Sequence, residues 1–196
     1  MGREFELKYR ATPQVLQAIA GDTKGESRYY EMQTTYYDTA ARELAERDCT
    51  LRRRMENAES ICTLKFPVAG RGRGECELPR QEIAQAVEEL CAMAKKPELF
   101  ALIQKGIEPV CGARFQRQAI TVQLTDCVVE IALDQGVLLG AGKEIPLCEV
   151  EVELKSGDPE EMMIYATLLA QRYGLKEEKR SKFHRASLLA KGELHG

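Results

Sequence analysis

The chain has 196 residues, of which 44% are hydrophobic and 30% charged, values typical of a soluble globular protein that is long enough to bury a core. The formal net charge is −3, which argues against nucleic acid as a partner because nucleic-acid-binding domains carry basic surfaces. No apolar run in the sequence approaches the roughly 18 residues that a membrane-spanning helix needs.

Seven cysteines, with no Cys-x-x-Cys pair, indicate reduced thiols rather than a disulfide framework. The N-terminus carries Arg3, Glu4 and Glu6 where a signal peptide would need an apolar stretch. We therefore expect a cytoplasmic protein without a membrane segment. No linker-like stretch divides the chain, so residues 1–196 are predicted to form a single domain.

In the first half of the chain, strand patterns come before helical ones. Alternating charged and apolar residues predict a strand over 3–10. Thr12 and Pro13 are typical of a helix start, and Gly21 is expected to end that helix. Further strands are predicted at 33–38, 49–55, 60–66 and 73–78, with helices at 81–95 and 98–104.

The second half returns to strands and ends in helices. The strands are predicted at 114–124, 127–134, 137–141 and 146–155. Asp158 and Pro159 are expected to begin a helix that runs through Arg172 and stops at Gly174, and a final helix is predicted over 182–190. This order predicts an α+β fold dominated by antiparallel strands.

Several predicted strands carry charged or polar side chains on one face, because alternate residues of a strand share a face. Strand by strand, these residues are Glu4, Glu6 and Lys8; Thr50, Arg52 and Arg54; Thr63 and Lys65; Arg73, Glu75 and Glu77; Arg117; Glu130 and Asp134; and Glu149, Glu151, Glu153 and Lys155. One interpretation is an open sheet with this face in solvent. The other is a sheet closed into a barrel, with the charges inside and the helices packed outside.

The barrel interpretation predicts a class of ligand. So many charges are too costly in a dry interior, so the barrel would be wet and filled with ions. Arginine and lysine bind phosphate oxygens, and clustered carboxylates bind a divalent cation that bridges the same oxygens. The pattern therefore predicts a complex of metal and polyphosphate.

A series of motifs in a fixed order resembles the CYTH family, the triphosphate tunnel metalloenzymes. The motifs are EFELK at 4–8, YYDT at 36–39, LRRR at 51–54, TLK ending at Lys65, RGECEL at 73–78, EIALDQG at 130–136, EVELKSG at 151–157 and SK at 181–182. The resemblance implies an eight-stranded antiparallel β-barrel tunnel that binds triphosphates with Mg²⁺ or Mn²⁺. It is strongest to the bacterial inorganic triphosphatases.

The resemblance also implies roles for individual residues. The expected metal ligands are Glu4, Glu6, Glu151 and Glu153, while Glu130 and Asp134, like Glu75 and Glu77, either hold a second ion or pair with the bases. The expected substrate-binding residues are Lys8, Arg52, Arg54, Lys65, Arg73, Arg117 and Lys182. The expected catalytic group is Glu4, Glu6, Lys8, Arg52, Arg54 and Lys65.

One position departs from the pattern of the family. Several relatives carry Lys-x-Arg on the strand after the central helices, whereas this chain has Phe115 and Arg117. Arg114 is near in sequence, but its direction is left open. Either Tyr36 or Tyr37 is expected to face the site, because alternation allows only one of them to do so.

The leading functional prediction is the metal-dependent hydrolysis of inorganic triphosphate to pyrophosphate and phosphate. A second prediction places other chemistry in the same tunnel: hydrolysis of nucleoside or thiamine triphosphate, or cyclisation of ATP by a class IV adenylate cyclase. A third, of a different class, is a non-catalytic polyphosphate-binding module. The oligomeric state is left open, with a homodimer among the alternatives.

Overall fold

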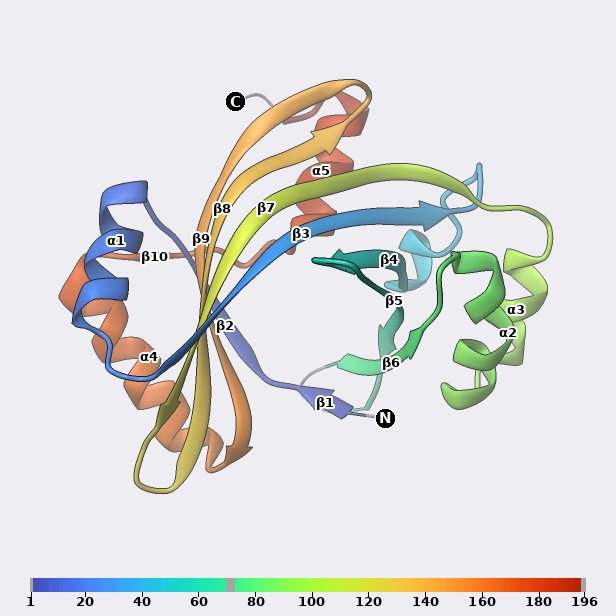
Figure 1. Ribbon diagram of the computed structural model, residues 1–196. Coiled ribbons are helices and arrows are strands. Elements are labelled where there is room, and N and C mark those ends of the chain that lie inside the picture. Colours follow the sequence, from blue (N-terminus) through green and yellow to red (C-terminus); the bar gives the residue numbers. More distant parts are fainter. Residues whose placement is uncertain (1, 70–72, 195–196) are drawn as a thin grey trace.

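One curled antiparallel sheet forms the body of the molecule (Figure 1). The computed structural model describes residues 2–69 and 73–194, and only the backbone of 2–4. The strands are β1 (Gly2–Glu4), β2 (Glu6–Arg10), β3 (Glu26–Asp38), β4 (Thr50–Glu56), β5 (Glu59–Pro67), β6 (Arg73–Pro79), β7 (Glu108–Gln123), β8 (Cys127–Gly140), β9 (Lys143–Gly157) and β10 (Lys176–Glu177). Their order in the sheet is β1-β6-β5-β4-β3-β7-β8-β9-β2-β10.

This order corrects the expected eight-stranded closed barrel. Within the described residues there are ten strands in an open order, and the predicted strand over 3–10 is interrupted at Phe5. On one side of Phe5, β1 pairs with β6, and on the other side β2 pairs with β9. The covalent chain, rather than a closed hydrogen-bond ladder, therefore joins the two sides of the sheet. Alternation in the sequence predicted the strand, but it did not predict that its two halves pair with different strands.

The long strand β8 corrects a second expectation, because the chain was predicted to break into two strands near Gly136. Residues Cys127–Gly140 form one continuous strand. A Cβ atom at Gly136 would collide with the carbonyl oxygen of Arg114 and the backbone of Phe115 on β7. The glycine therefore allows close approach of a neighbouring strand and does not mark a turn.

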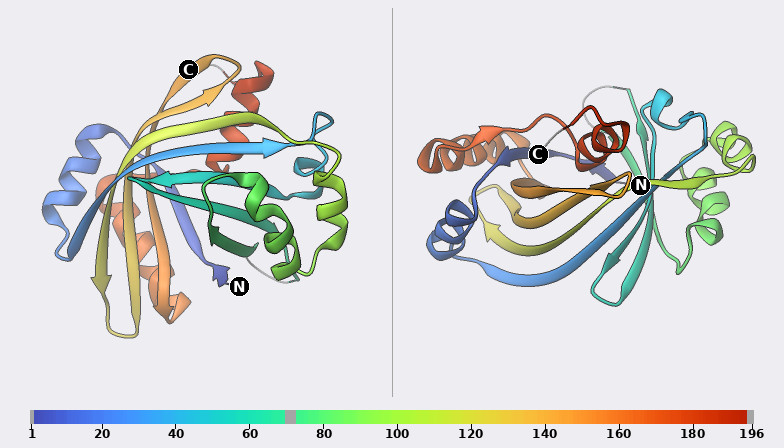
Figure 2. Two further views of the ribbon diagram at one scale, coloured as in Figure 1. Left: turned by 45° about the vertical axis from the view of Figure 1, so that its right-hand side comes forward. Right: turned by 90° about the horizontal axis from the view of Figure 1, so that it is seen from above.

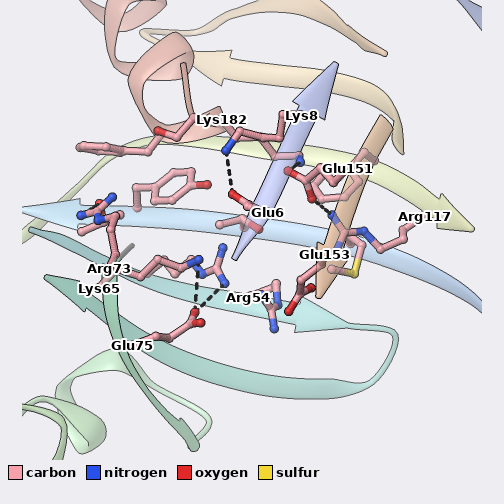
Figure 3. A pocket seen from close by; sticks show the side chains of 18 of the residues that line it. Glu6, Lys8, Arg54, Lys65, Arg73, Glu75, Arg117, Glu151, Glu153 and Lys182 are labelled. Carbon is pink, nitrogen blue, oxygen red and sulfur yellow. Dashed lines mark hydrogen bonds and ion pairs between the residues drawn. The ribbon is translucent and has the colours of Figure 1, made fainter. Parts of the chain in front are cut away.

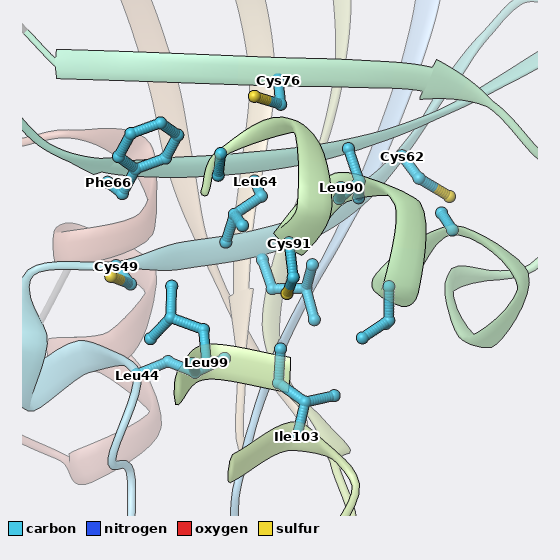
Figure 4. Packing of buried hydrophobic residues seen from close by; sticks show 14 of the residues in the cluster. Leu44, Cys49, Cys62, Leu64, Phe66, Cys76, Leu90, Cys91, Leu99 and Ile103 are labelled. Atoms are coloured by element: carbon cyan, nitrogen blue, oxygen red, sulfur yellow. The ribbon is translucent and has the colours of Figure 1, made fainter. Parts of the chain in front are cut away.

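Four helices cover the outer face of the sheet. They are α1 (Pro13–Asp22), α2 (Ile83–Met93), α3 (Pro97–Ile103) and α4 (Pro159–Tyr173). One apolar core lies under α1 and α4, and a second lies between α2, α3 and strands β4–β6 (Figure 4). Thr12 and Asp158 cap their helices as predicted, and Gly174 ends α4 in a left-handed conformation, whereas α1 continues past Gly21. No described helix has the length and apolar character to cross a membrane.

Helix α5 (Lys182–Lys191) lies on the inner face instead, which corrects the expectation that all helices pack outside (Figures 1 and 2). Its Ala186 packs in a third apolar cluster with Phe115 and Leu138. At Gly140 of β8, a Cβ atom would lie 2.6 Å from the backbone nitrogen of Ala190 and 2.8 Å from the carbonyl oxygen of Ala186. This close contact fixes α5 against the sheet and places its first residues beside the charged strand faces.

Candidate active site

The inner face of the sheet surrounds a cavity of about 700 Å³ (Figure 3). Alternate residues of eight strands, β2 to β9, line it, as strand geometry requires. Residues 179–181 and the start of α5 complete the lining. The lining residues are Glu6, Lys8, Tyr30, Met32, Thr34, Tyr36, Thr50, Arg52, Arg54, Glu56, Lys65, Arg73, Glu75, Glu77, Phe115, Arg117, Glu130, Glu151, Glu153, Lys155, Lys179, Arg180, Ser181, Lys182, Phe183 and His184. The charged faces of the strands therefore enclose a common space rather than pointing outward.

A basic wall comes from β4, β5 and β6. The side chains of Arg52, Arg54 and Lys65 are only 14–16% exposed. Their contacts with Glu75 and Glu77 are loose, at 3.3–3.7 Å between nitrogen and oxygen. Such distances are longer than the roughly 2.7–2.9 Å of a charge-assisted hydrogen bond.

Arg54 is the cation of this wall whose surroundings disfavour its charge. Burial, and then the neighbouring Arg52, lower the pKa of Arg54 below its ordinary value even though Glu56 lies 2.6 Å away. Its Nε is buried and has no hydrogen-bond partner among the described residues. A buried donor without a partner is costly. An anion in the cavity would accept from this nitrogen and would also favour the charged form of Arg54.

The opposite wall is a dense network of ion pairs built by β7, β8, β9 and α5. Arg117 donates from Nε and Nη2 to the two carboxylate oxygens of Asp134, each at 2.7 Å, and from Nη2 to Glu151 at 2.6 Å. The ammonium of Lys182 contacts Asp134 at 2.7 Å, Glu151 at 2.9 Å, and also Glu149. Arg185 pairs with the far oxygen of Glu149.

Glu151, Lys182 and Lys8 are charged at neutral pH. Burial alone would raise the pKa of Glu151, but Lys182, Arg117 and Lys8 outweigh it and hold that pKa well below its usual range. Burial would likewise lower the pKa of Lys182, but Asp134, Glu149 and Glu151 raise it well above its usual range. The pKa of Lys8 is also raised, because Glu6 and Glu151 outweigh its burial. Neither lysine is therefore poised to act as a general base.

Phe115 occupies the position where several relatives carry a lysine. Its ring lies 5.1 Å from Nζ of Lys182 and 5.7 Å from the guanidinium carbon of Arg117, measured to the ring centroid. Both distances suit cation–π contacts. Arg114 points outward and pairs with Glu144 at 3.2 Å, so it does not replace the missing lysine. Phe115 supports the two cations instead of adding a third.

Three glutamates form one row across the sheet. Glu6 is opposite Glu153 on the β2–β9 pair, and Glu153 is opposite Glu130 on the β8–β9 pair. All three line the cavity. Lys155 reaches Glu130 at 3.3 Å and Glu153 at 2.8 Å. Directly opposed like charges destabilise a sheet, so a further cation would stabilise this row.

The donors present fit a hard divalent cation, which prefers carboxylate oxygens. The row of Glu6, Glu153 and Glu130 presents such oxygens to the cavity. Asp134, Glu149 and Glu151 also bring carboxylate oxygens within 4.8 Å of one another. Both groups are paired with lysines, the buried one with Lys182 and the row with Lys8 and Lys155. Asp134 and Glu149 are fully buried, whereas the row lines the cavity, so the row fits an ion better.

Most of the predicted site residues meet in this cavity. The described side chains of Glu6, Lys8, Arg52, Arg54, Lys65, Arg73, Arg117, Glu130, Glu151, Glu153 and Lys182 all line it. Asp134 is fully buried behind the wall, where Arg117 and Lys182 hold it. The side chain of Glu4 lies outside the described residues.

The sequence-based prediction missed some residues of the site and left others undecided. Tyr36, rather than Tyr37, lines the cavity. Glu56 shares the parity of Arg52 and Arg54, so strand alternation was a sufficient signal for it. His184 gave no such signal, because its place in the lining depends on α5 lying inside the curled sheet.

Comparison with known proteins decides the family. The CYTH domain family matches residues 2–187. The chain belongs to the CYTH family. The inorganic triphosphatase of Haemophilus influenzae is 30% identical to this CYTH chain over 200 residues, a match that covers 96% of the chain and 55% of the relative. The chain thus spans about half the length of that protein.

Solved structures agree on the CYTH fold. The PH1819 protein of Pyrococcus horikoshii has a TM-score of 0.62 at 21% identity, with 96% of this chain and 99% of that chain covered. HpAC1 of Hippeastrum, described as a candidate adenylyl cyclase with a dominant triphosphatase activity, has a TM-score of 0.61 at 19% identity, with 98% and 97% covered. At these identities the similarity shows the fold alone.

Proposed function

We propose that this chain is a divalent-metal-dependent triphosphatase that hydrolyses inorganic triphosphate to pyrophosphate and phosphate. The observation that carries the proposal is that one cavity brings together a basic wall, in which Nε of Arg54 is buried without a partner among the described residues, and a row of three glutamates. The family and the named relative support the same reaction class.

The residues of the chain supply binding and orientation. In this proposal Arg52, Arg54 and Lys65 exchange their loose carboxylate contacts for phosphate oxygens, while Lys8, Arg117 and Lys182 hold the other end of the ligand. Such positioning and charge neutralisation account for most of the rate gain in phosphoryl transfer. Water then attacks one terminal phosphorus, the bridging P–O bond breaks, and pyrophosphate leaves as the water loses its protons to solvent or product.

A metal ion would be held by Glu6, Glu153 and Glu130, with Glu151 beside them. When bound, Mg²⁺ or Mn²⁺ withdraws charge from phosphate oxygens and favours the attack of water. Glu4 remains a predicted ligand, while Asp134 is better placed to orient Arg117 and Lys182.

The cellular setting and the domain organisation belong to the same proposal. All seven cysteines are free thiols, which suits a cytoplasmic protein. Strands from the beginning and the end of the chain pair in one sheet, which supports a single domain over 1–196.

A second candidate is the hydrolysis of an organic triphosphate, and one observation favours it. A second cavity of about 460 Å³ adjoins the first and shares Thr50, Arg73, Ser181, Phe183 and His184 with it. An organic group attached to the triphosphate has room there, beside the aromatic ring of Phe183.

A substrate panel tests the proposal. Purified protein is assayed with tripolyphosphate, ATP and thiamine triphosphate, each with Mg²⁺, with Mn²⁺ or with EDTA, and released phosphate and cyclic AMP are measured. We expect the highest kcat/KM with tripolyphosphate and no phosphate release in EDTA. Faster turnover of ATP or thiamine triphosphate would favour the second candidate. Tight tripolyphosphate binding without turnover would indicate a binding module.

A further inference from the structure

Glu178 is a buried charge to which the proposed reaction gives no role. It is 4% exposed and lies in the connecting segment, residues 176–181, which leads from α4 to α5. Within this segment β10 pairs with the edge of β2, and the backbone N–H of Glu178 donates to the carbonyl of Lys8 at 2.8 Å. Glu178 therefore lies beside one cavity residue, Lys8, and shortly before another, Lys182.

The carboxylate of Glu178 is held by two arginines. It accepts from Nε of Arg10 at 2.7 Å, and from the backbone nitrogen, Nε and Nη2 of Arg180 at 3.0, 3.1 and 3.2 Å. Burial alone would raise the pKa of Glu178, but the hydrogen bonds from Arg180 and Arg10 lower it to about 2. Glu178 is therefore charged at any pH at which an enzyme of this kind would work.

Arg180 faces two ways. Its side chain is 35% exposed and lines the cavity beside Lys179 and Ser181. Two of its guanidinium nitrogens are engaged by Glu178, and the third, Nη1, has no partner among the described residues. A guanidinium held on one edge keeps its other edge ready for an oxyanion, with less rotamer freedom to lose on binding.

We propose that Glu178 is a positioning residue that holds Arg180 at the mouth of the cavity, where Arg180 makes an additional contact with a phosphate group of the ligand. The proposal rests on the proposed function for its ligand class, a polyphosphate. It differs from a purely structural role for Glu178, because it requires the effect of Glu178 on binding to pass through Arg180.

A double-mutant cycle tests this dependence. The Kd for tripolyphosphate is measured by calorimetry in EDTA, at fixed ionic strength, for wild type, Glu178→Gln, Arg180→Ala and the double variant. We expect each single change to raise Kd about tenfold, the low end for loss of a charged hydrogen bond. The double variant should bind no worse than Arg180→Ala, because Glu178 has nothing left to position.

Two further variants keep the test sharp. Glu177→Gln alters the exposed neighbour of Glu178 in β10 and should leave Kd unchanged. Arg180→Lys retains the charge but offers one nitrogen, which cannot hold both Glu178 and the ligand, so its Kd should also rise. This variant reports on the proposal even if Glu178→Gln folds poorly.

These measurements distinguish failure of this inference from failure of the proposed triphosphatase function. Multiplicative effects in the cycle, or wild-type Kd values in Glu178→Gln and Arg180→Lys, would overturn the inference while tripolyphosphate hydrolysis by the wild type stood. Failure of the wild type to bind tripolyphosphate at all would overturn both.

Discussion

Arg53 and Arg54 are adjacent in β4 but lie on opposite faces of the sheet. Arg54 lines the cavity, whereas Arg53 contacts Glu82 at the start of α2. We predict that Arg54→Ala raises KM for tripolyphosphate by the equivalent of about 1.5–3 kcal/mol, the usual value of a charged hydrogen bond. Arg53→Ala removes the same charge from the outer face and should leave KM near the wild-type value. Steady-state kinetics of the two variants checks this, and equal KM changes would contradict the assignment.

Phe115 gives a second prediction at this scale. Phe115→Lys would place a third cation against Lys182 and Arg117 and remove both cation–π contacts. We expect it to lower the free energy of unfolding by more than Phe115→Leu, which removes only the aromatic face, worth about 0.5–2 kcal/mol per contact. Urea denaturation compares the two variants. A Phe115→Lys protein as stable as the wild type would show that the site tolerates the lysine of the relatives.

Strand parity allowed many individual residues of the site to be predicted. Arg52, Arg54, Glu151 and Glu153 alternate with apolar neighbours, and the structure places all four in the cavity lining. Asp134 lies on the same face of its strand as Glu130, yet it is fully buried, and its carboxylate is held by Arg117 and by Lys182 from a distant part of the chain. The alternation of a strand predicts on which face of the sheet a side chain lies, but not which other segments of the chain cover it.

At the scale of elements, the seating of α5 on β8 depends on Gly140. A Cβ atom there would meet backbone atoms of α5, which cannot move aside as a flexible side chain can. We predict that Gly140→Ala lowers the free energy of unfolding by about 1–3 kcal/mol, the usual cost of overpacking. It should also raise KM, since Lys182 begins this helix.

Gly21 is the matched control. It lies inside α1, and a Cβ atom there would have no neighbour within 4 Å. Gly21→Ala should therefore be neutral or stabilise the protein by about 0.4–1 kcal/mol. Thermal denaturation of both variants checks the contrast, and a similar loss of stability in the two would show that α5 is not tightly seated.

Elements with strong local signals were the predictable ones. The proline and cap at Asp158 and the glycine after α4 predicted that helix almost to its ends. The strand predicted over 33–38 covers only the end of β3. The pattern missed residues 26–32 because they are mostly exposed and show no alternation of buried and exposed side chains. β10 has two residues and exists only because β2 offers a free edge, which no local pattern encodes.

For the whole molecule, the low pKa of Glu178 predicts how stability depends on pH. The folded-state pKa of about 2 lies below the ordinary value of 4.5, so the carboxylate contributes stability above pH 4.5. That contribution is lost as the pH falls from 4.5 toward 2. We predict that the wild type exceeds Glu178→Gln in free energy of unfolding at neutral pH and that the difference shrinks over this interval. Chemical denaturation at a series of pH values measures it, and a constant difference would contradict the shift.

The topology of the chain was harder to predict from the sequence than its individual residues and elements. Charged strand faces indicated an enclosed site, and the enclosure is present, but the described strands form an open sheet and not a closed barrel. The break at Phe5 and the entry of α5 from inside both depend on contacts between distant segments. Composition and period carry no information about such pairings.

Arg117, Lys182 and Arg185 pair with three carboxylates, so the wall built by β7, β8, β9 and α5 largely neutralises itself. Under the proposed function, an incoming anion must displace several internal partners at once. A single orthophosphate offers too few oxygens to do this, whereas a chain of phosphates can engage both walls together. The site would then select ligands by their valence and length, and would stay unsaturated by the small anions that surround it in a cell.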